Sequence, residues 1–242
     1  MSWPYPKIVA HRGGGRLAPE NTLGAICLGA SMGFKGVEFD VMLAGDQTPV
    51  LIHDETVDRT TDGRGIVSKL TYKELLAVNI KGNKEKQEKI PSFEQAARLC
   101  RELGVWANVE IKPALGHERR TGDAVARASR AYWQGAALMP VLSSFSTVSL
   151  AAAAAAVPEL PRGLLVGRVP KHWRELMRDL GCVALHCNYR ALNATLAREI
   201  HGAGYAILCW TVNDRRSAKK LSGWGVDCLV TDRLDRIRPD FR

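Results

Sequence analysis

The amino-acid sequence predicts a (β/α)8 TIM barrel with a β-hairpin and a short insertion over its C-terminal mouth. Its 242 residues suit this fold, which typically takes about 250. Short apolar segments alternate with helix-like segments along the chain, a pattern typical of parallel α/β folds. The predicted strands are residues 7–11, 36–42, 49–53, 105–111, 141–144, 163–166, 184–187, 206–210 and 228–231.

These strands are one more than a barrel needs, and the spacing of two of them explains the surplus. Only residues 43–48 separate segment 36–42 from segment 49–53, whereas a crossover to a parallel neighbour takes about a dozen residues. Segment 49–53 is therefore expected to return antiparallel, as a hairpin above the barrel. The remaining segments then form eight parallel strands.

The segment from about 54 to 91 interrupts the alternation. Residues 59–65 are rich in turn formers, and residues 82–89 are mostly charged and predict a solvated loop. We expect an insertion over the barrel mouth that is too small to have a core of its own. No linker or repeat divides the chain, so residues 1–242 are predicted to form one domain.

Composition and charge exclude several classes of protein. The net charge is +9, yet the basic residues are spread along the chain without alternating aromatics, so no nucleic-acid partner is expected. The apolar run 151–156 is too short to span a bilayer, and no stable membrane insertion is expected. The first residues lack an apolar signal core, and the six cysteines form no paired motif. These features predict a cytoplasmic protein with reduced thiols.

The first chemistry-bearing segment is a glycine-rich loop after the first strand. His11 and Arg12 begin the loop, and residues 19–22 end it where a helix starts. A titratable imidazole beside a fixed cation, among free backbone N–H groups, suits an anionic substrate such as a phosphate ester. Residues 19–22 are interpreted as a structural latch into the helix.

Acidic side chains alternate on two of the predicted strands. Glu38 and Asp40 share one strand face, and Glu110 and Lys112 share a face of the next barrel strand. In a barrel these faces point inward near the C-terminal end, where active sites lie. Crowded carboxylates need a cation between them, and oxygen ligands favour Mg²⁺ or Ca²⁺ over zinc. The alternative is a buried ion network with Arg12 and Lys112.

Further candidates follow other strands. His53 ends the hairpin strand and, paired with His11, supplies the second half of an acid–base pair. His186 lies at a strand end and is a weaker candidate for the mouth. Phe145 is expected to form an aromatic wall, and Trp210 either a second wall or a plug of the barrel core.

One rival interpretation concerns the glycines. The pattern Gly13-x-Gly15-x-x-Ala18 after a strand, followed by Glu38, outlines a dinucleotide-binding fingerprint. Residues 19–21 delay the helix, however, and a lone ribose-binding acid leaves the histidines unexplained. An NAD-dependent oxidoreductase is therefore disfavoured.

The ordered set of motifs resembles the glycerophosphodiester phosphodiesterase family, most closely the bacterial cytosolic enzymes linked to glycerol-3-phosphate uptake. The matching segments run almost the length of the chain. They are His11-Arg12-Gly13, Ala18-Pro19-Glu20-Asn21-Thr22, Glu38-Phe39-Asp40, His53-Asp54, Arg59-Thr60-Thr61, Glu110-Ile111-Lys112, Ser144-Phe145, Trp210-Thr211-Val212-Asn213 and Thr231-Asp232.

The resemblance implies hydrolysis of glycerophosphodiesters, such as glycerophosphocholine or glycerophosphoethanolamine, to sn-glycerol 3-phosphate and an alcohol. It implies one divalent cation, Mg²⁺ or Ca²⁺. Many members have a proline soon after the Thr-Asp pair, whereas Arg233 follows here, which puts a role for Asp232 in doubt. The implied roles are His11 and His53 as acid and base, Glu38, Asp40 and Glu110 as metal ligands, Arg12 and Lys112 as phosphate ligands, and Phe145 and Trp210 as walls of the glycerol pocket.

Two nearer alternatives stay open at this point. One is a related barrel phosphodiesterase that acts on intact phospholipids, although the polar 54–91 segment favours a small headgroup diester. The other is a non-catalytic phosphate-binding barrel, which the two histidines disfavour. The sequence leaves open the headgroup, the metal, the assignment of acid and base, the attacking oxygen, and whether the chain forms a homo-oligomer.

Overall fold

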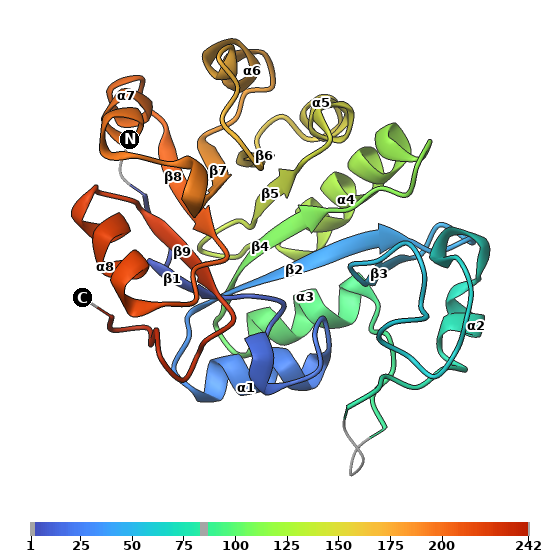
Figure 1. Cartoon of the computed structure of the whole chain (residues 1–242). Helices are drawn as coiled ribbons and strands as arrows, with labels where there is room; N and C mark the ends of the chain where they lie inside the picture. Colours follow the sequence, from blue (N-terminus) through green and yellow to red (C-terminus); the bar gives the residue numbers. More distant parts are fainter. Residues whose placement is uncertain (1–2, 83–86, 242) are drawn as a thin grey trace.

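The structure is a computed structural model that describes residues 3–82 and 87–241, and Figure 1 shows its elements. The strands are β1 Ile8–Ala10, β2 Gly36–Leu43, β3 Pro49–Leu51, β4 Trp106–Ile111, β5 Val141–Ser144, β6 Arg162–Val166, β7 Ala184–Asn188, β8 Ala206–Trp210 and β9 Cys228–Thr231. The α-helices are α1 Leu23–Ser31, α2 Tyr72–Leu75, α3 Phe93–Glu102, α4 Glu118–Tyr132, α5 Thr147–Ala156, α6 Trp173–Asp179, α7 Ala194–Gly202 and α8 Arg215–Gly223. Short 3-10 helices are η1 Gly15–Leu17, η2 Val67–Lys69 and η3 Tyr189–Ala191.

Eight parallel strands close into a barrel. Their order is β1-β9-β8-β7-β6-β5-β4-β2, and β1 also pairs with β2. Ala10 closes the ring, because it pairs with Thr231 on one side and with Val37 on the other. Helices lie between successive barrel strands (Figure 1). The predicted (β/α)8 barrel is confirmed.

The surplus strand forms the predicted hairpin. β3 runs antiparallel to the end of β2, with Val41 opposite Leu51 and Leu43 opposite Pro49. The strand is shorter than expected and ends at Leu51, so His53 lies in the loop that follows it. The hairpin and the segment after it extend from one side of the barrel (Figure 1).

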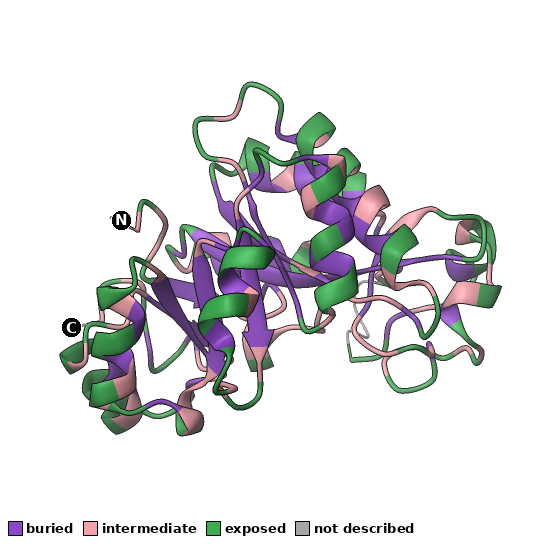
Figure 2. Ribbon diagram, turned by 90° about the horizontal axis from the view of Figure 1, so that it is seen from above, coloured by how far each residue is buried: buried purple, intermediate pink, exposed green. Residues whose placement is uncertain are grey.

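Alternation along the strands separates two apolar layers. On β2, Phe39 faces outward and packs against Phe93 of α3, with ring centroids 6.1 Å apart. Burying one such side chain contributes about 1.5–3 kcal/mol. Figure 2 shows buried strands within helices whose outer faces are exposed. The barrel interior holds a second apolar cluster of Val9, Trp106, Val141, Leu208, Cys228 and Val230.

Aromatic residues close the N-terminal end of the barrel. Tyr5 stacks on Trp106, with ring centroids 4.6 Å apart. Trp3 packs edge-on against both rings, and the Trp106 indole N–H donates to the Met139 carbonyl. The C-terminal end of the barrel is therefore the end left for a functional site.

The insertion packs its apolar side chains on the hairpin rather than around a core of its own. Val57, Val67 and Leu75 are fully buried and pack in one cluster with Met42 and Val50 of the hairpin. The cluster forms because the hairpin supplies apolar side chains that the insertion lacks. Within the predicted loop 82–89, residues 83–86 lie outside the described part of the chain.

Two further sequence predictions concern the cysteine thiols and the apolar run 151–156. All six cysteines are free, and only Cys27 is exposed. The apolar run 151–156 lies in α5, which ends at Ala156. In residues 3–82 and 87–241, we find no helix with the length and apolar character needed to cross a bilayer.

Candidate active site

The three predicted metal-binding carboxylates meet at the barrel mouth. β2 and β4 are neighbours in the sheet, and Asp40 lies directly opposite Glu110. Glu38 precedes Asp40 by two residues on the same face, and one oxygen from each of the three carboxylates lies within 4.8 Å of the others. Three buried carboxylates at this spacing fit a hard divalent cation such as Mg²⁺ or Ca²⁺.

The electrostatics of this cluster indicate a shortage of positive charge. Burial, together with the charge of Asp40, raises the pKa of Glu38 to about 7 and that of Glu110 to about 8. Burial acts in the same direction on Asp40, but the cations of Arg12 and Lys112 hold its pKa below the usual value. The two cations thus neutralise one carboxylate well and the others incompletely, and a divalent cation would supply the missing charge.

Arg12 and Lys112 lie beside the acidic cluster, as the alternative ion network requires. Arg12 Nε lies 3.4 Å from Asp40 Oδ2. Lys112 Nζ lies 3.1 Å from Glu110 Oε1 and 3.6 Å from Asp40 Oδ1. Both side chains keep about a fifth of their surface exposed, 19% and 24%. Both residues also line the cavity at the barrel mouth, so the ion network leaves part of each cation accessible to an anion.

His11 is held by a carboxylate from the opposite end of the chain. Its Nδ1 lies 2.6 Å from Asp232 Oδ1, and the Asn213 side-chain amide donates to Asp232 Oδ2 at 2.8 Å. Burial alone would lower the pKa of His11, but the Asp232 hydrogen bond and the charge of Glu38 raise it overall. Asp232 therefore contacts a predicted site residue, although the missing proline had put its role in doubt. Its position directly after the last barrel strand is the sequence feature that points to the barrel mouth.

His53 has a carboxylate partner of its own. Its Nδ1 lies 2.7 Å from Asp54 Oδ1. Arg59 of the insertion donates to Asp54 and also to Glu20, where Nη2 lies 2.7 Å from Oε1. Glu20 in turn accepts from Arg12 Nη1 at 2.8 Å. A chain of ion pairs therefore links His53 to the loop that holds Arg12.

The interpretation of residues 19–22 as a latch is only partly correct. Thr22 caps α1 by accepting a hydrogen bond from the Ala25 N–H. Asn21, however, donates from Nδ2 to Asp40 Oδ2 at 2.9 Å and accepts from the Asp40 N–H at 3.1 Å. Glu20 and Asn21 belong to the site, because the left-handed backbone at Asn21, with φ of 57°, turns this segment toward β2.

A small cavity joins the predicted site residues. Its volume is about 120 Å³, and His11 and His53 both line it together with Glu38 and Glu110 of the acidic cluster. Phe145 and Trp210 form an aromatic wall with ring centroids 5.5 Å apart. Trp210 also packs on the interior apolar cluster, so it serves as both wall and plug. Asn108, which alternation places on the face of Glu110, also lines the cavity, although no role for it is expected from the sequence.

His186 does not reach the mouth. β7 continues to Asn188, so His186 lies two residues inside the strand, where it is fully buried. Burial lowers the pKa of His186 to about 3, which keeps the ring neutral. The prediction failed because the strand end was placed one residue too early. Ser144, at the end of β5, donates from its hydroxyl to the Ile111 carbonyl of β4 and so has a structural role.

Comparison with known proteins gives this geometry a family. Residues 11–236 match the glycerophosphoryl diester phosphodiesterase family. The chain belongs to this family. A glycerophosphodiester phosphodiesterase of Caldanaerobacter subterraneus subsp. tengcongensis is 32% identical over 93% of this chain and 93% of its own. A solved Oleispira antarctica phosphodiesterase, in complex with the product sn-glycerol-3-phosphate, is 37% identical, with a TM-score of 0.90 over 94% of this chain and 93% of its own.

Membership of the glycerophosphodiester phosphodiesterase family makes the chain a phosphoric diester hydrolase. A Thermotoga maritima member, 24% identical with a TM-score of 0.76 over 96% of this chain and 97% of its own, shares the fold. The dinucleotide-binding alternative is excluded by the family match. The acidic cluster supplies three neighbouring carboxylates, the kind of ligand that a divalent cation such as Mg²⁺ or Ca²⁺ prefers.

Proposed function

We propose that this chain hydrolyses glycerophosphodiesters to sn-glycerol 3-phosphate and an alcohol, with His11 and His53 as the acid–base pair. The observation that supports it most is the cavity in which both histidines lie beside the acidic cluster. The product in the related Oleispira antarctica structure is consistent with this chemistry. Glycerophosphocholine and glycerophosphoethanolamine are the test substrates.

The phosphate is bound between the two cations. Arg12 and Lys112 both contact Asp40, so they are held at the edge of the acidic cluster with their remaining donors toward the cavity. A divalent cation, Mg²⁺ or Ca²⁺, held by Glu38, Asp40 and Glu110 would neutralise the non-bridging phosphate oxygens. Without substrate, the carboxylates hold Arg12 and Lys112 in place, which lowers the entropic cost of binding.

The histidines move the protons. Each ring has its Nδ1 against a carboxylate, Asp232 for His11 and Asp54 for His53. This contact fixes the tautomer and leaves Nε2 of each ring for the reaction. One imidazole accepts the proton of the attacking oxygen, and the other donates a proton to the leaving alkoxide. The attacking oxygen is that of water, which gives glycerol 3-phosphate directly, or that of the neighbouring glycerol hydroxyl. The second route gives a cyclic phosphate, which water then opens with the proton-accepting and proton-donating roles of the two histidines exchanged.

The aromatic wall selects the glycerol side of the substrate. Phe145 is 49% exposed and stands over a cavity of about 120 Å³, a volume suited to a group as small as glycerol. We also propose that the barrel and the insertion act as one catalytic domain, because His11 comes from the first and His53 is held by the second. A cytoplasmic location stays a prediction from the sequence.

A coupled assay for glycerol 3-phosphate tests both parts of the proposal. We expect release from glycerophosphocholine and glycerophosphoethanolamine, complete loss of release in excess EDTA, and recovery after addition of Mg²⁺ or Ca²⁺. Full activity in chelator would contradict the metal requirement. Absence of glycerol 3-phosphate from every diester, with metal present, would contradict the substrate class.

A further inference from the structure

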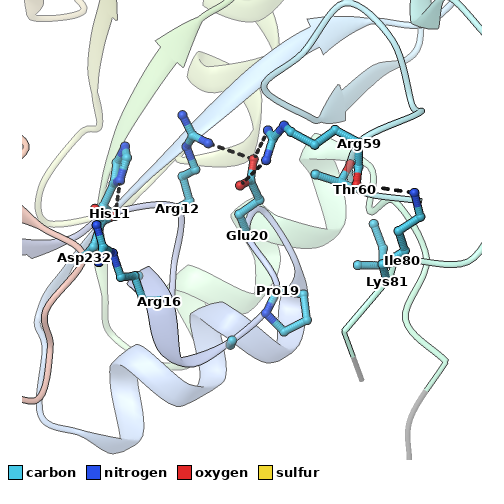
Figure 3. Close-up of a pocket in the computed structure, with 12 residues that line it drawn as sticks. His11, Arg12, Arg16, Pro19, Glu20, Arg59, Thr60, Ile80, Lys81 and Asp232 are labelled. Atoms are coloured by element: carbon cyan, nitrogen blue, oxygen red, sulfur yellow. Dashed lines mark hydrogen bonds and ion pairs between the residues drawn. The ribbon is translucent and has the colours of Figure 1, made fainter. Parts of the chain in front are cut away.

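A second, larger cavity opens on the outer side of His11 and Arg12. Its volume is about 520 Å³. Figure 3 shows its walls: Arg16 stands beside Asp232 at one end, Arg59 and Lys81 of the insertion lie at the other, and Pro19 lies on the floor. The cavity thus lies between the barrel and the insertion and is open to solvent.

This outer cavity continues the catalytic site. His11 and Arg12 line both the outer cavity and the small cavity at the barrel mouth. A phosphodiester bound at Arg12 has two ester arms. When the glycerol arm occupies the small aromatic cavity, the outer cavity is in reach of the other arm, which carries the leaving alcohol.

The outer cavity carries an excess of positive charge. Its acids already have partners: Glu20 pairs with Arg12 and Arg59, and Asp232 pairs with His11. Arg16 lines the same cavity, and it forms no ion pair with any carboxylate that the structure describes. Lys81 donates to the backbone carbonyl of Asp58. A carbonyl is neutral, so this hydrogen bond does not compensate the charge of Lys81.

A third opening offers the opposite charge. This cavity, of about 220 Å³, lies beyond His53 and Phe145, and its charged lining residues are Glu55, Glu110 and Lys112. Because Glu110 pairs with Lys112, the remaining charge is that of Glu55, which would favour a cationic headgroup over an anionic one. The charge of the headgroup therefore reports which opening receives it.

We propose that the outer cavity is the subsite for the leaving alcohol and that it selects headgroups bearing an additional negative charge. This specificity rests on the proposed function, since it concerns the second arm of the same substrate. Arg16 and Lys81 are the residues that attract the added anionic group. The contribution of exposed cations is modest and screened by salt, so the preference is one of rate rather than of absolute exclusion.

The test uses two substrates that differ only in charge at one end. Glycerophosphoethanolamine is acylated on its amine to give the N-butanoyl and the N-succinyl derivatives, which exchange a terminal methyl for a carboxylate. With wild-type enzyme and metal at low salt, we expect kcat/KM to be about three- to tenfold higher for the N-succinyl substrate. This ratio is the quantity to follow, and it should fall toward one as salt is added.

Variants locate the effect. Arg16→Ala is expected to lower the ratio by about threefold, and Arg16→Glu to bring it below one. Arg64→Ala is the matched control, because Arg64 is an arginine of the insertion that is exposed like Arg16 but lines none of these three cavities. Glu55→Gln probes the third opening in the same way.

Each outcome decides between sites. A wild-type ratio of one or less, or an equal change in Arg16→Ala and Arg64→Ala, overturns the proposal. A ratio that responds to Glu55→Gln and not to Arg16→Ala assigns the headgroup to the third opening instead. Failure of the underlying function looks different: none of the substrates, the parent glycerophosphoethanolamine included, would then release glycerol 3-phosphate.

Discussion

His11 and His53 are the same chemical unit, an imidazole with a carboxylate at Nδ1, but they are supported differently. His11 follows barrel strand β1, and its N–H donates to the Thr231 carbonyl of β9. Its side chain is 19% exposed. His53 follows the edge strand β3, is 30% exposed, and depends on Asp54, which is itself held by Arg59 of the insertion. The barrel holds one imidazole, and a peripheral loop holds the other.

The difference teaches that the two imidazoles to which we assign proton transfer are held by separate parts of the molecule. The His11 side inherits the rigidity of closed parallel strands. The His53 side depends on ion pairs with partly exposed partners, and such pairs contribute little individually and are weakened by salt. Substitutions on the two sides should therefore have unequal effects except where the chemistry itself is removed.

Removal of either imidazole should give the largest loss of activity. The loss should be similar for His11 and His53, because each substitution removes a reacting group. We expect His11→Ala and His53→Ala each to lower kcat by about 10³-fold, because each removes one proton transfer. The assay is glycerol 3-phosphate release, with circular dichroism to confirm the fold. His172→Ala, at an exposed helix start, is the control and should retain normal turnover. Near-normal kcat in either active-site variant would refute its assignment.

Neutralising the carboxylate partners should reveal the difference. Asp232→Asn is expected to lower kcat about a hundredfold, because an amide can present its N–H to Nδ1 and favour the wrong tautomer of His11. Asp54→Asn should cost less than about tenfold, since His53 is more exposed and water can take the place of the lost acceptor. Steady-state kinetics measure both. Equal losses would show that the two sides are equally constrained.

Titration of the acidic cluster in metal-free protein should give the smallest effect, measured as a change in stability rather than in rate. In metal-free protein the pKa values of Glu38 and Glu110 are about 7 and about 8, above their ordinary 4.5. The folded state then holds protons more tightly than the unfolded state, so the free energy of unfolding falls as pH rises from 4.5 to 8.

Calorimetry checks this dependence. The Tm of chelator-treated protein should fall across that interval, and saturating Mg²⁺ should remove most of the fall because the bound cation stabilises the ionised carboxylates. Glu110→Gln should flatten the metal-free curve. A Tm that rises with pH in chelator would contradict the predicted direction.

Much of the barrel and of the candidate site follows from local sequence pattern. Segments 141–144, 206–210 and 228–231 coincide with β5, β8 and β9, because each is a short apolar run bounded by polar residues. The acidic cluster was predictable for a different reason. Alternation puts Glu38 and Asp40 on one face, and barrel geometry brings the next strand alongside.

Contacts between distant segments were not predictable in this way. His11 and Asp232 are 221 positions apart, and their contact depends on closure of the ring by β9. The apolar cluster beside the insertion was not predictable, because four of its ten buried residues come from residues 42–52. Asn21 was missed because its contact with Asp40 requires a left-handed backbone that nothing in its neighbours specifies.

The apolar cluster shared by the hairpin and the insertion has a consequence for how this scaffold can change. Because Val57, Val67 and Leu75 pack on the hairpin and belong to a different cluster from the one under the barrel helices, residues 54–91 can be exchanged as a cassette. A transplanted cassette that preserves these apolar positions would bring new residues to the place of Arg59 and Lys81 while β1, β2, β4 and β9 stay as they are. The fold thereby offers a route to new substrate ranges in which the barrel residues of the site are inherited unchanged, provided that the cassette keeps Asp54 as the partner of His53.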